Sequence, residues 1–319
     1  MSASHDEFVR DDFVLPFQLG GASSSEGARV RGRLIRLGPV LNDILGRHAY
    51  PAPIAALVGE TLVLAVLLAG MLKYRGVFTL QVTGDGPVRT LIADVVAGED
   101  AGLRTVRAHA RFDPALLDAV ADTTTGVALL GEGHLAFTVD QGEYTERYQG
   151  VVALGGETLT DCVRHYFRQS EQIATGLVTA VGPVGDGWRV GGLVVQQLPD
   201  DSGESDSDQD GPDADGDVDG DVECDDHWRR LMVLTSTCTA GELIDQALPA
   251  HDLLHRLFHQ EQAVVYPETA LAFGCRCSRE RVEVMLGSLK PEDLEHVRVD
   301  GQIEVTCEFC GTRYAFGSQ

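Results

Sequence analysis

Four cysteines near the carboxyl end restrict the structure of this chain more than any other feature. They are grouped in two close pairs, Cys275 with Cys277 and Cys307 with Cys310. Two such pairs, brought together by folding, form a tetrahedral site of four thiolates, which suits zinc. The spacing therefore predicts one Zn²⁺ per chain with four ligands, Cys275, Cys277, Cys307 and Cys310.

The segment that carries these cysteines, residues 273–319, is short. A core built from so few residues is marginally stable unless a metal or a disulfide supports it. Structural zinc contributes roughly 10–16 kcal/mol of apparent binding energy, which is comparable with the whole stability of a domain, about 5–15 kcal/mol. We therefore expect metal binding and the folding of this segment to be coupled.

Several kinds of four-cysteine site fit this spacing. A permanent zinc knuckle without any redox response is one, and an iron–sulfur cluster is another. Redox use is favoured because a disulfide between cysteines two or three residues apart closes a small, strained loop, which makes the bond more oxidising and easily reversed. A thiol oxidoreductase that uses Cys307 and Cys310 is a weaker alternative, since the thioredoxin-like βαβ context is missing. No Ser–His–Asp or paired-carboxylate arrangement stands out, so we expect no enzyme.

The charge of the chain is concentrated in one low-complexity segment. Residues 200–226 contain 14 acidic and no basic residues, within a net charge of −24 for the whole chain. Such a segment lacks the apolar surface that offsets ordering entropy, so we expect it to be disordered. Residues 215–226 match a calcium-binding loop at several positions, but no helix precedes them and the final bidentate Glu is missing, so we interpret them as a solvated spacer. The acidic balance argues against nucleic acid as a main partner.

The beginning of the chain shows no basic region followed by an apolar run, so we expect a cytoplasmic protein with reduced thiols. The one candidate membrane span, residues 52–74, contains Glu60 and Lys73, and its uninterrupted apolar part is too short for a bilayer. We interpret it as a buried core helix and expect no membrane partner. The loop at residues 84–87 lacks the Gly-Lys-Ser/Thr continuation of a phosphate-binding loop and is interpreted as a turn, so no nucleotide is expected.

The order of the expected elements indicates an α+β fold. Strands with alternating apolar residues are predicted at 30–37 and from 76 onward, a long helix at 52–74 and an amphipathic helix at 158–171. These elements do not alternate as βαβ units, so α+β is the better class. The expected organisation is a flexible N-terminus at 1–27, an α+β core at 28–199, the acidic disordered insertion at 200–226, a helical linker at 227–272 and a zinc-binding domain at 273–319.

Several segments, in this order, resemble the heat-shock protein 33 family of bacterial redox-regulated chaperones. They include QVTGDGPVRTLI, ERYQGVVAL, DCVRHYFRQSEQ, GGLVVQQLP and LFHQEQAVVYP, followed by CRCSRER and the Cys-x-x-Cys pair. The resemblance covers residues 28–199 and 227–319.

The resemblance implies a mechanism. The reduced, zinc-bound protein is inactive; oxidation forms the disulfides Cys275–Cys277 and Cys307–Cys310 and releases zinc. The linker then unfolds, and the protein dimerises and holds unfolding client proteins without ATP. The alternative without redox switching is a constitutive zinc-stabilised protein-binding module.

The chain departs from the family pattern in three places, the acidic insertion and two extra thiols. The acidic insertion is unusual, and the extra thiols Cys224 and Cys238, in or beside the linker, are expected to complicate the disulfide pairing. Cys162, on the amphipathic helix, is interpreted as a packed core thiol. His251, His255 and His259 share one helix face through their four-residue spacing, and we interpret that face as solvated or partly packed rather than as a second metal site.

Overall fold

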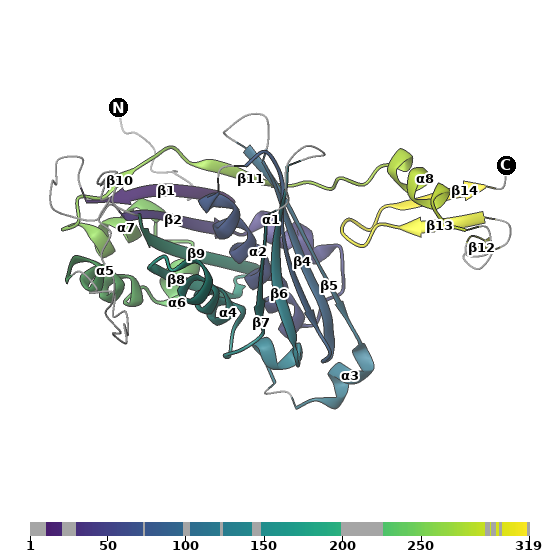
Figure 1. The fold of residues 1–319 in the computed structure, drawn as a ribbon, viewed down its shortest axis with the longest axis horizontal. Helices are drawn as coiled ribbons and strands as arrows, with labels where there is room; N and C mark the ends of the chain where they lie inside the picture. Colours follow the sequence, from purple (N-terminus) through teal and green to yellow (C-terminus); the bar gives the residue numbers. More distant parts are fainter. Residues whose placement is uncertain are drawn as a thin grey trace, which may run out of the picture.

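The apolar segment at residues 52–71 forms the central helix of the fold, α2 (Ala52–Met71). Pro51 and Pro53 fix the backbone at its start, where the missing N–H groups cost nothing. A large sheet curves around α2, which packs against β4 and β5 on one side and against β8 and β9 on the other (Figure 1). The computed structural model of the 319-residue chain describes residues 11–20, 30–72, 74–97, 103–121, 124–141, 148–198, 226–290, 294, 298–299 and 302–317.

The large sheet has 11 strands, and nearly all neighbouring strands run antiparallel. The exception is β11, which runs parallel to β5 and separates it from β1. The short strand β10 (Val264–Val265) pairs with β1 beside the main order. That order is β7 (Tyr148–Ala153), β6 (Gly133–Asp140), β3 (Gly76–Gly84), β4 (Val88–Ala97), β5 (Leu103–Phe112), β11 (Thr269–Phe273), β1 (Phe13–Leu19), β2 (Val30–Leu37), β9 (Gly187–Gln197) and β8 (Thr175–Val184).

The two faces of the curved sheet bury two separate apolar clusters. The concave face and α2 form the larger one, to which α1 (Pro39–Gly46) and α4 (Leu159–Tyr166) contribute. The opposite face of β1, β2, β8 and β9 is covered by three helices, α5 (Asp226–Ser236), α6 (Ala240–Ile244) and α7 (Ala250–Phe258), which lie together at one end of the molecule in Figure 1. The α+β class predicted from the sequence is confirmed.

The remaining elements are short. They are α3 (Pro114–Ala119), the 3₁₀ turn η1 (Gly126–Leu129) and the π turn η2 (Phe167–Glu171) that follows α4. The amphipathic helix predicted at 158–171 is an α-helix only as far as Tyr166, and its last part is the π turn η2, which continues the path of α4. Residues 84–87 form the predicted turn between β3 and β4, in which Asp85 Oδ1 accepts a 2.8 Å hydrogen bond from the backbone N–H of Glu132.

The structure corrects the expectation of a flexible segment over residues 1–27. Residues 13–19 form β1, which pairs along its whole length with β2 on one side and with β10 and β11 on the other. Its partners at 264–273 are remote in sequence, so no local pattern could indicate them. The range expected as a helical linker also changes character, because its last part is extended and joins the core sheet as β10 and β11.

The expectations for the acidic segment lie outside the described residues. Residues 199–225, with Cys224 and the calcium-loop match, belong to that part of the chain, and Asp226 begins α5. The helix α2 is long and apolar enough to cross a bilayer, but 94% of its most apolar window is buried inside the protein. The interpretation of α2 as a core helix is therefore confirmed.

Candidate metal centre

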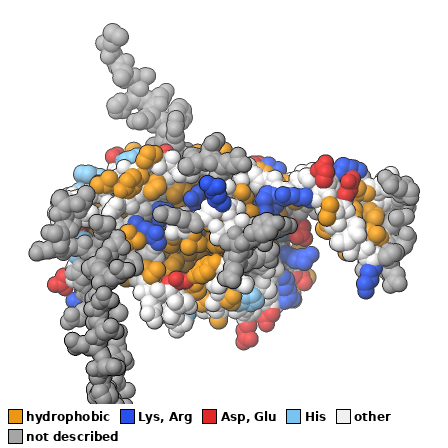
Figure 2. All heavy atoms as spheres, turned by 45° about the horizontal axis from the view of Figure 1, so that its top comes forward, with side chains coloured by type: hydrophobic (Ala, Val, Ile, Leu, Met, Phe, Trp, Pro, Cys, Tyr) orange, Lys and Arg blue, Asp and Glu red, His pale blue; other side chains and the backbone are white. Residues whose placement is uncertain are grey.

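The four cysteines lie in a small module that projects from one end of the core. Its sheet consists of β12 (Arg298–Val299), β13 (Gln302–Thr306) and β14 (Arg313–Gly317), and its helix is α8 (Arg279–Gly287). In Figure 2 the module extends away from the core, and Lys and Arg side chains gather on the part of the core next to it.

Each cysteine pair lies in a tight segment of backbone. Cys307 and Cys310 occupy the turn between β13 and β14, where the N–H of Gly311 donates to the Cys307 carbonyl at 2.8 Å. Gly311 has φ +71°, a conformation that a residue with a side chain rarely adopts, which explains the glycine after the pair. Cys275 and Cys277 lie in the extended segment between β11 and α8, and the Ser278 side chain caps α8 by accepting from the Arg281 N–H.

The folded chain brings the four sulfur atoms together. All four lie within 4.8 Å of one another. Cys275 Sγ lies 3.4 Å from Cys277 Sγ and 3.7 Å from Cys307 Sγ, and Cys277 Sγ lies 3.3 Å from Cys310 Sγ. Tetrahedral zinc with bonds of about 2.3 Å requires sulfur separations of about 3.8 Å. The donor set and its geometry therefore fit a metal ion, as the sequence predicted.

Neighbouring hydroxyl groups give the four thiols different environments. Burial raises the pKa of Cys277 to about 12, although the Tyr314 hydroxyl donates to its sulfur at 3.1 Å. Burial also raises the pKa of Cys310, but hydrogen bonds with Thr312 and the neighbouring thiols outweigh it and lower the value to about 6. The sulfurs are half-buried, so small oxidants in solvent have access to them.

Comparison with known proteins decides the family. The profile described as "Hsp33 protein" matches residues 22–317. A "33 kDa chaperonin" from Caulobacter vibrioides strain NA1000 is 37% identical over 97% of this chain and 96% of its own length. Another, from Pseudomonas fluorescens strain SBW25, is 38% identical over 90% of this chain and 86% of its own length.

This chain belongs to the Hsp33 family. A crystal structure of an Hsp33 homolog, the 33 kDa chaperonin of Thermotoga maritima, has the same fold, with a TM-score of 0.71 and 22% sequence identity over 97% of this chain and 95% of the homolog. The Hsp33 family is a chaperone family, which implies that its members bind unfolded client proteins. The resemblance noted in the sequence is confirmed.

Among the described residues of this Hsp33 chain, Cys162, Cys238 and the three histidines at 251, 255 and 259 do not join the metal centre. Cys162 is 1% exposed and packs in the larger apolar cluster, which confirms its interpretation as a core thiol. Cys238 is 4% exposed, in the turn between α5 and α6. The histidines at 251 and 255 are exposed on α7, and His259 is exposed directly after it. Within the described ranges the four cysteines are the one group found that is suited to a metal.

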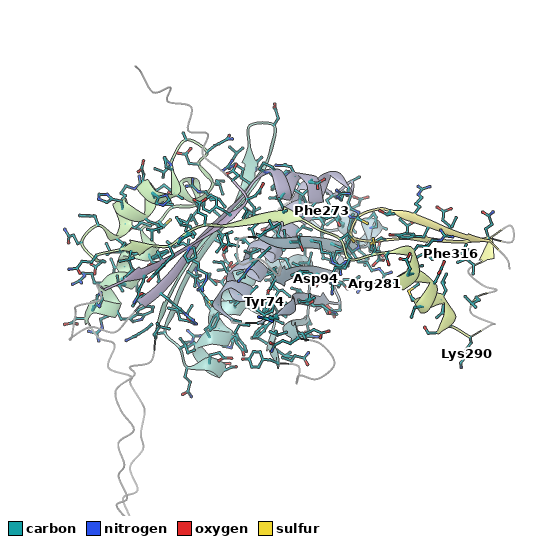
Figure 3. All side chains as sticks on the ribbon, turned by 90° about the horizontal axis from the view of Figure 1, so that it is seen from above. Tyr74, Asp94, Phe273, Arg281, Lys290 and Phe316 are labelled. Carbon is teal, nitrogen blue, oxygen red and sulfur yellow. The ribbon has the colours of Figure 1, made fainter. Side chains whose placement is uncertain are left out.

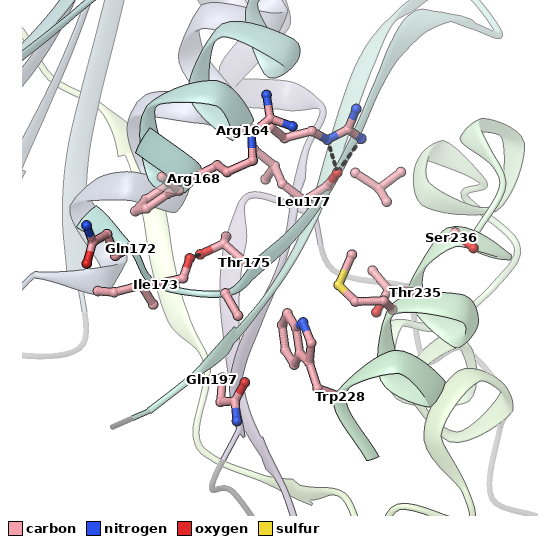
Figure 4. Close-up of a pocket in the computed structure, with 14 residues that line it drawn as sticks. Arg164, Arg168, Gln172, Ile173, Thr175, Leu177, Gln197, Trp228, Thr235 and Ser236 are labelled. Atoms are coloured by element: carbon pink, nitrogen blue, oxygen red, sulfur yellow. Dashed lines mark hydrogen bonds between the residues drawn. The ribbon is translucent and has the colours of Figure 1, made fainter. Parts of the chain in front are cut away.

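A cavity of about 970 Å³ lies between the Hsp33 core and the first linker helix. Strand β8 and the turn η2 form one wall, and Trp228 and Met232 of α5 form the other (Figure 4). Arg164 also lines the cavity, but its Nε donates to the Leu177 carbonyl at 3.0 Å, so its charge is already engaged. Sequence patterns did not indicate this cavity, because its walls come from three separate stretches of the chain.

Proposed function

We propose that this protein is a redox-regulated holdase chaperone that works without ATP. In the reduced, zinc-bound state it is inactive, and oxidation of the four cysteines activates it toward unfolding proteins in the cytoplasm. The observation that carries the proposal is the apolar face of the core sheet beneath α5, α6 and α7. These three helices, called the cover below, belong to the stretch of chain that leads directly into Cys275.

The covered face is rich in large apolar side chains. On the sheet side it includes Leu15, Phe17 and Leu193, which are at most 2% exposed. On the helix side Phe258 stacks on Phe17 with ring centroids 5.8 Å apart. If the helices leave, both apolar surfaces meet water at once, and exposed apolar patches of this kind bind partly unfolded proteins.

The sheet pairing that attaches the cover to the core is short. Residues 264–265 and 269–273 add only two short strands to the sheet, and Gly274 N–H donates to the Val106 carbonyl at 3.1 Å. The remaining contacts are the packing of three short helices on the sheet and the hydrogen bonds from Arg36 to the carbonyls of Glu242 and Leu248. Short peripheral helices open before a long-stranded core when an adjoining segment moves. A change at the cysteines is therefore positioned to release the cover.

The chemistry of activation is a four-electron oxidation. When bound, zinc supplies a cation that joins the two cysteine pairs and keeps the sulfurs as thiolates. A peroxide oxidises one thiolate to a sulfenic acid and releases hydroxide, and a second thiolate then displaces hydroxide to form the disulfide. Formation of each disulfide removes two electrons from a pair of thiolates, and these electrons reduce one peroxide molecule to two hydroxide ions. Disulfide sulfurs no longer act as thiolate ligands, so the oxidised site does not retain the metal.

We propose the pairs Cys275–Cys277 and Cys307–Cys310 on the family resemblance. Sulfur distances do not select these pairs, since Cys277 lies almost equally close to Cys275 and Cys310. The released apolar face also supports self-association, so we propose that the oxidised protein is a homodimer.

A constitutive zinc-stabilised binding module is the alternative. The observation that favours it is the exposed apolar surface of α8, where Val284 is 75% and Met285 47% exposed. That surface would be available to a partner whether or not the cysteines are oxidised.

Aggregation assays with thermally unfolding citrate synthase separate the two functions. We expect the oxidised protein to suppress aggregation and the reduced, zinc-loaded protein to have little effect. Zinc release and thiol content are followed in the same samples, and two disulfides should form per zinc released. Equal suppression by the two forms would exclude the redox switch and favour the constitutive module.

A further inference from the structure

A buried carboxylate on the core anchors the first cysteine pair. Asp94, on β4, is 2% exposed, and its Oδ1 accepts a 2.6 Å hydrogen bond from Thr79 Oγ1. Its Oδ2 accepts from Arg107 Nε at 2.8 Å and from Arg276 Nη2 at 2.9 Å. Arg276 is the residue between Cys275 and Cys277, so the middle of the first pair is bound to the core. Figure 3 shows Asp94 on the core near the base of the module.

The second cysteine pair is bound through the same core group. The guanidinium of Arg107 lies 3.8 Å from the centroid of the Phe309 ring, a cation–π contact, and Phe309 lies between Cys307 and Cys310. The Arg107 Nη1 atom also lies 3.5 Å from Cys275 Sγ. One core arginine therefore contacts both pairs, and Asp94 holds that arginine in place.

We infer that Asp94 is a positioning residue for the metal centre. With Arg107 it forms a fixed ion pair on the core, to which the module docks through Arg276 and Phe309. A change in the bonding of the sulfurs then reaches the core directly, in addition to the route along β11. The inference deepens the proposed function and rests on it, because it assigns the contact by which the core and the cysteine centre affect each other.

The charges at this contact make docking reversible. Two guanidinium groups share the one carboxylate of Asp94, and Arg107, with a side chain only 11% exposed, is its resident partner. Arg276 has a side chain 36% exposed and can return to water when the module moves. The core then keeps a neutral Asp94–Arg107 pair, so no buried charge is left without a partner.

The position of Arg276 makes it sensitive to disulfide formation. The two-electron oxidation by peroxide described above shortens the Cys275–Cys277 sulfur separation from 3.4 Å to about 2.05 Å. Arg276 lies inside the ring that this bond closes, so its backbone must turn. The hydrogen bond from the Gly274 N–H to the Val106 carbonyl fixes the backbone just before the ring. The backbone change that accompanies ring closure therefore occurs at Arg276.

The substitution Arg276→Gln tests the docking without touching a sulfur or the core pair. The matched control is Arg313→Gln, whose side chain is 76% exposed and pairs with Glu304 inside the module. Both full-length variants are prepared reduced and zinc-loaded, and bound zinc, thiol content and amide hydrogen exchange are measured. We expect one zinc per chain in both. In Arg276→Gln alone, exchange in β4, β5 and the linker helices should rise roughly fivefold, as for the loss of one partly exposed ion pair.

A double-substitution cycle with Asp94→Asn tests the contact itself. If Asp94 acts through Arg276, adding Arg276→Gln to Asp94→Asn should change exchange little further. Three outcomes would each overturn the inference. Amide hydrogen exchange in Arg276→Gln could equal that of the control, the effects of the two substitutions on exchange could be strictly additive, or Arg276→Gln could lose zinc. These measurements use the reduced protein alone, so a chaperone assay that failed to show a redox switch would reject the proposed function while the docking result still stood.

Discussion

The guanidinium of Arg36, fully buried in the sheet, donates a 2.8 Å hydrogen bond to the backbone carbonyl of Glu242 in α6. A second donor of the same group binds the carbonyl of Leu248 in the loop before α7. Carbonyls near the end of a helix have no partner within it. A core arginine therefore supplies the bonds that the helical cover needs to stay in place.

Replacing Arg36 should loosen the cover. Arg36→Met retains most of the apolar stem but removes both donors, and the loss of hydrogen bonds from a charged group costs roughly 1.5–3 kcal/mol. We expect faster hydrogen exchange in α6 and α7 and activation by peroxide at a lower temperature. Arg229→Met is the control, since the Arg229 side chain is 65% exposed and pairs with Asp226. Unchanged exchange in Arg36→Met would show that these bonds do not hold the cover.

The attachment of α5 should depend on pH through Glu261. This buried carboxylate accepts bonds from Arg230 at 2.8 and 2.9 Å, and these bonds, with the nearby His227, hold its pKa below the ordinary 4.5. Because the folded pKa is the lower one, ionised Glu261 stabilises the docked helix above about pH 4.5, and this contribution is lost as the pH falls through the folded pKa.

Trp228 fluorescence during acid titration checks this prediction. The wild-type protein should release α5 as the pH falls below about 4.5, whereas Glu261→Gln should be looser at neutral pH and change less on acidification. Glu268→Gln, at an exposed position, should behave like the wild type. Identical titrations of wild type and Glu261→Gln would contradict the assignment.

Cys238 should report on the opening of the cover. Burial raises the pKa of its thiol to about 11, so near neutral pH its reactive thiolate is roughly 100-fold rarer than in an ordinary cysteine. We expect slow alkylation by iodoacetamide in the reduced protein and fast alkylation after peroxide activation, measured by mass spectrometry of the peptides. Cys162, buried in the core, is the internal control and should stay unreactive in both forms. Fast labelling of Cys238 in the reduced protein would mean that the cover is already open.

Loss of one cysteine ligand should unfold the module and spare the core. Cys307→Ser removes one thiolate of a site whose binding energy is roughly 10–16 kcal/mol. We expect zinc content to fall well below one per chain, with loss of exchange protection in β13 and β14 but not in β3 or β6. Cys162→Ser should keep a full complement of zinc. A chelator applied to the wild type should reproduce the Cys307→Ser pattern, and retained protection after zinc removal would show that the module folds without metal.

The features that sequence patterns could predict are the ones fixed locally. The cysteine spacing gave the cluster, and the apolar run at 52–71 gave the core helix, because in each case the deciding residues are close together in the chain. Strand β1 was missed since Pro16 is unfavourable inside a sheet and the strands on one of its two edges, β10 and β11, are remote in sequence. The Asp94 anchor was missed for the same reason: an acid in an alternating strand suggests a solvated position, and its partner Arg276 is far along the chain.

The parallel strand β11 has a consequence for how the protein is made. Phe13 pairs with Ala270, so β1, near the start of the chain, can pair with β11 only after most of the chain has been translated. Until residue 273 has left the ribosome, β1 and β5 have no partner on their facing edges, and the apolar face that α7 finally covers is open to water. During its own synthesis the nascent chain thus passes through a state with the same exposed face that we assign to the activated protein. Fast release and closure of the C-terminal part should limit self-association on the ribosome.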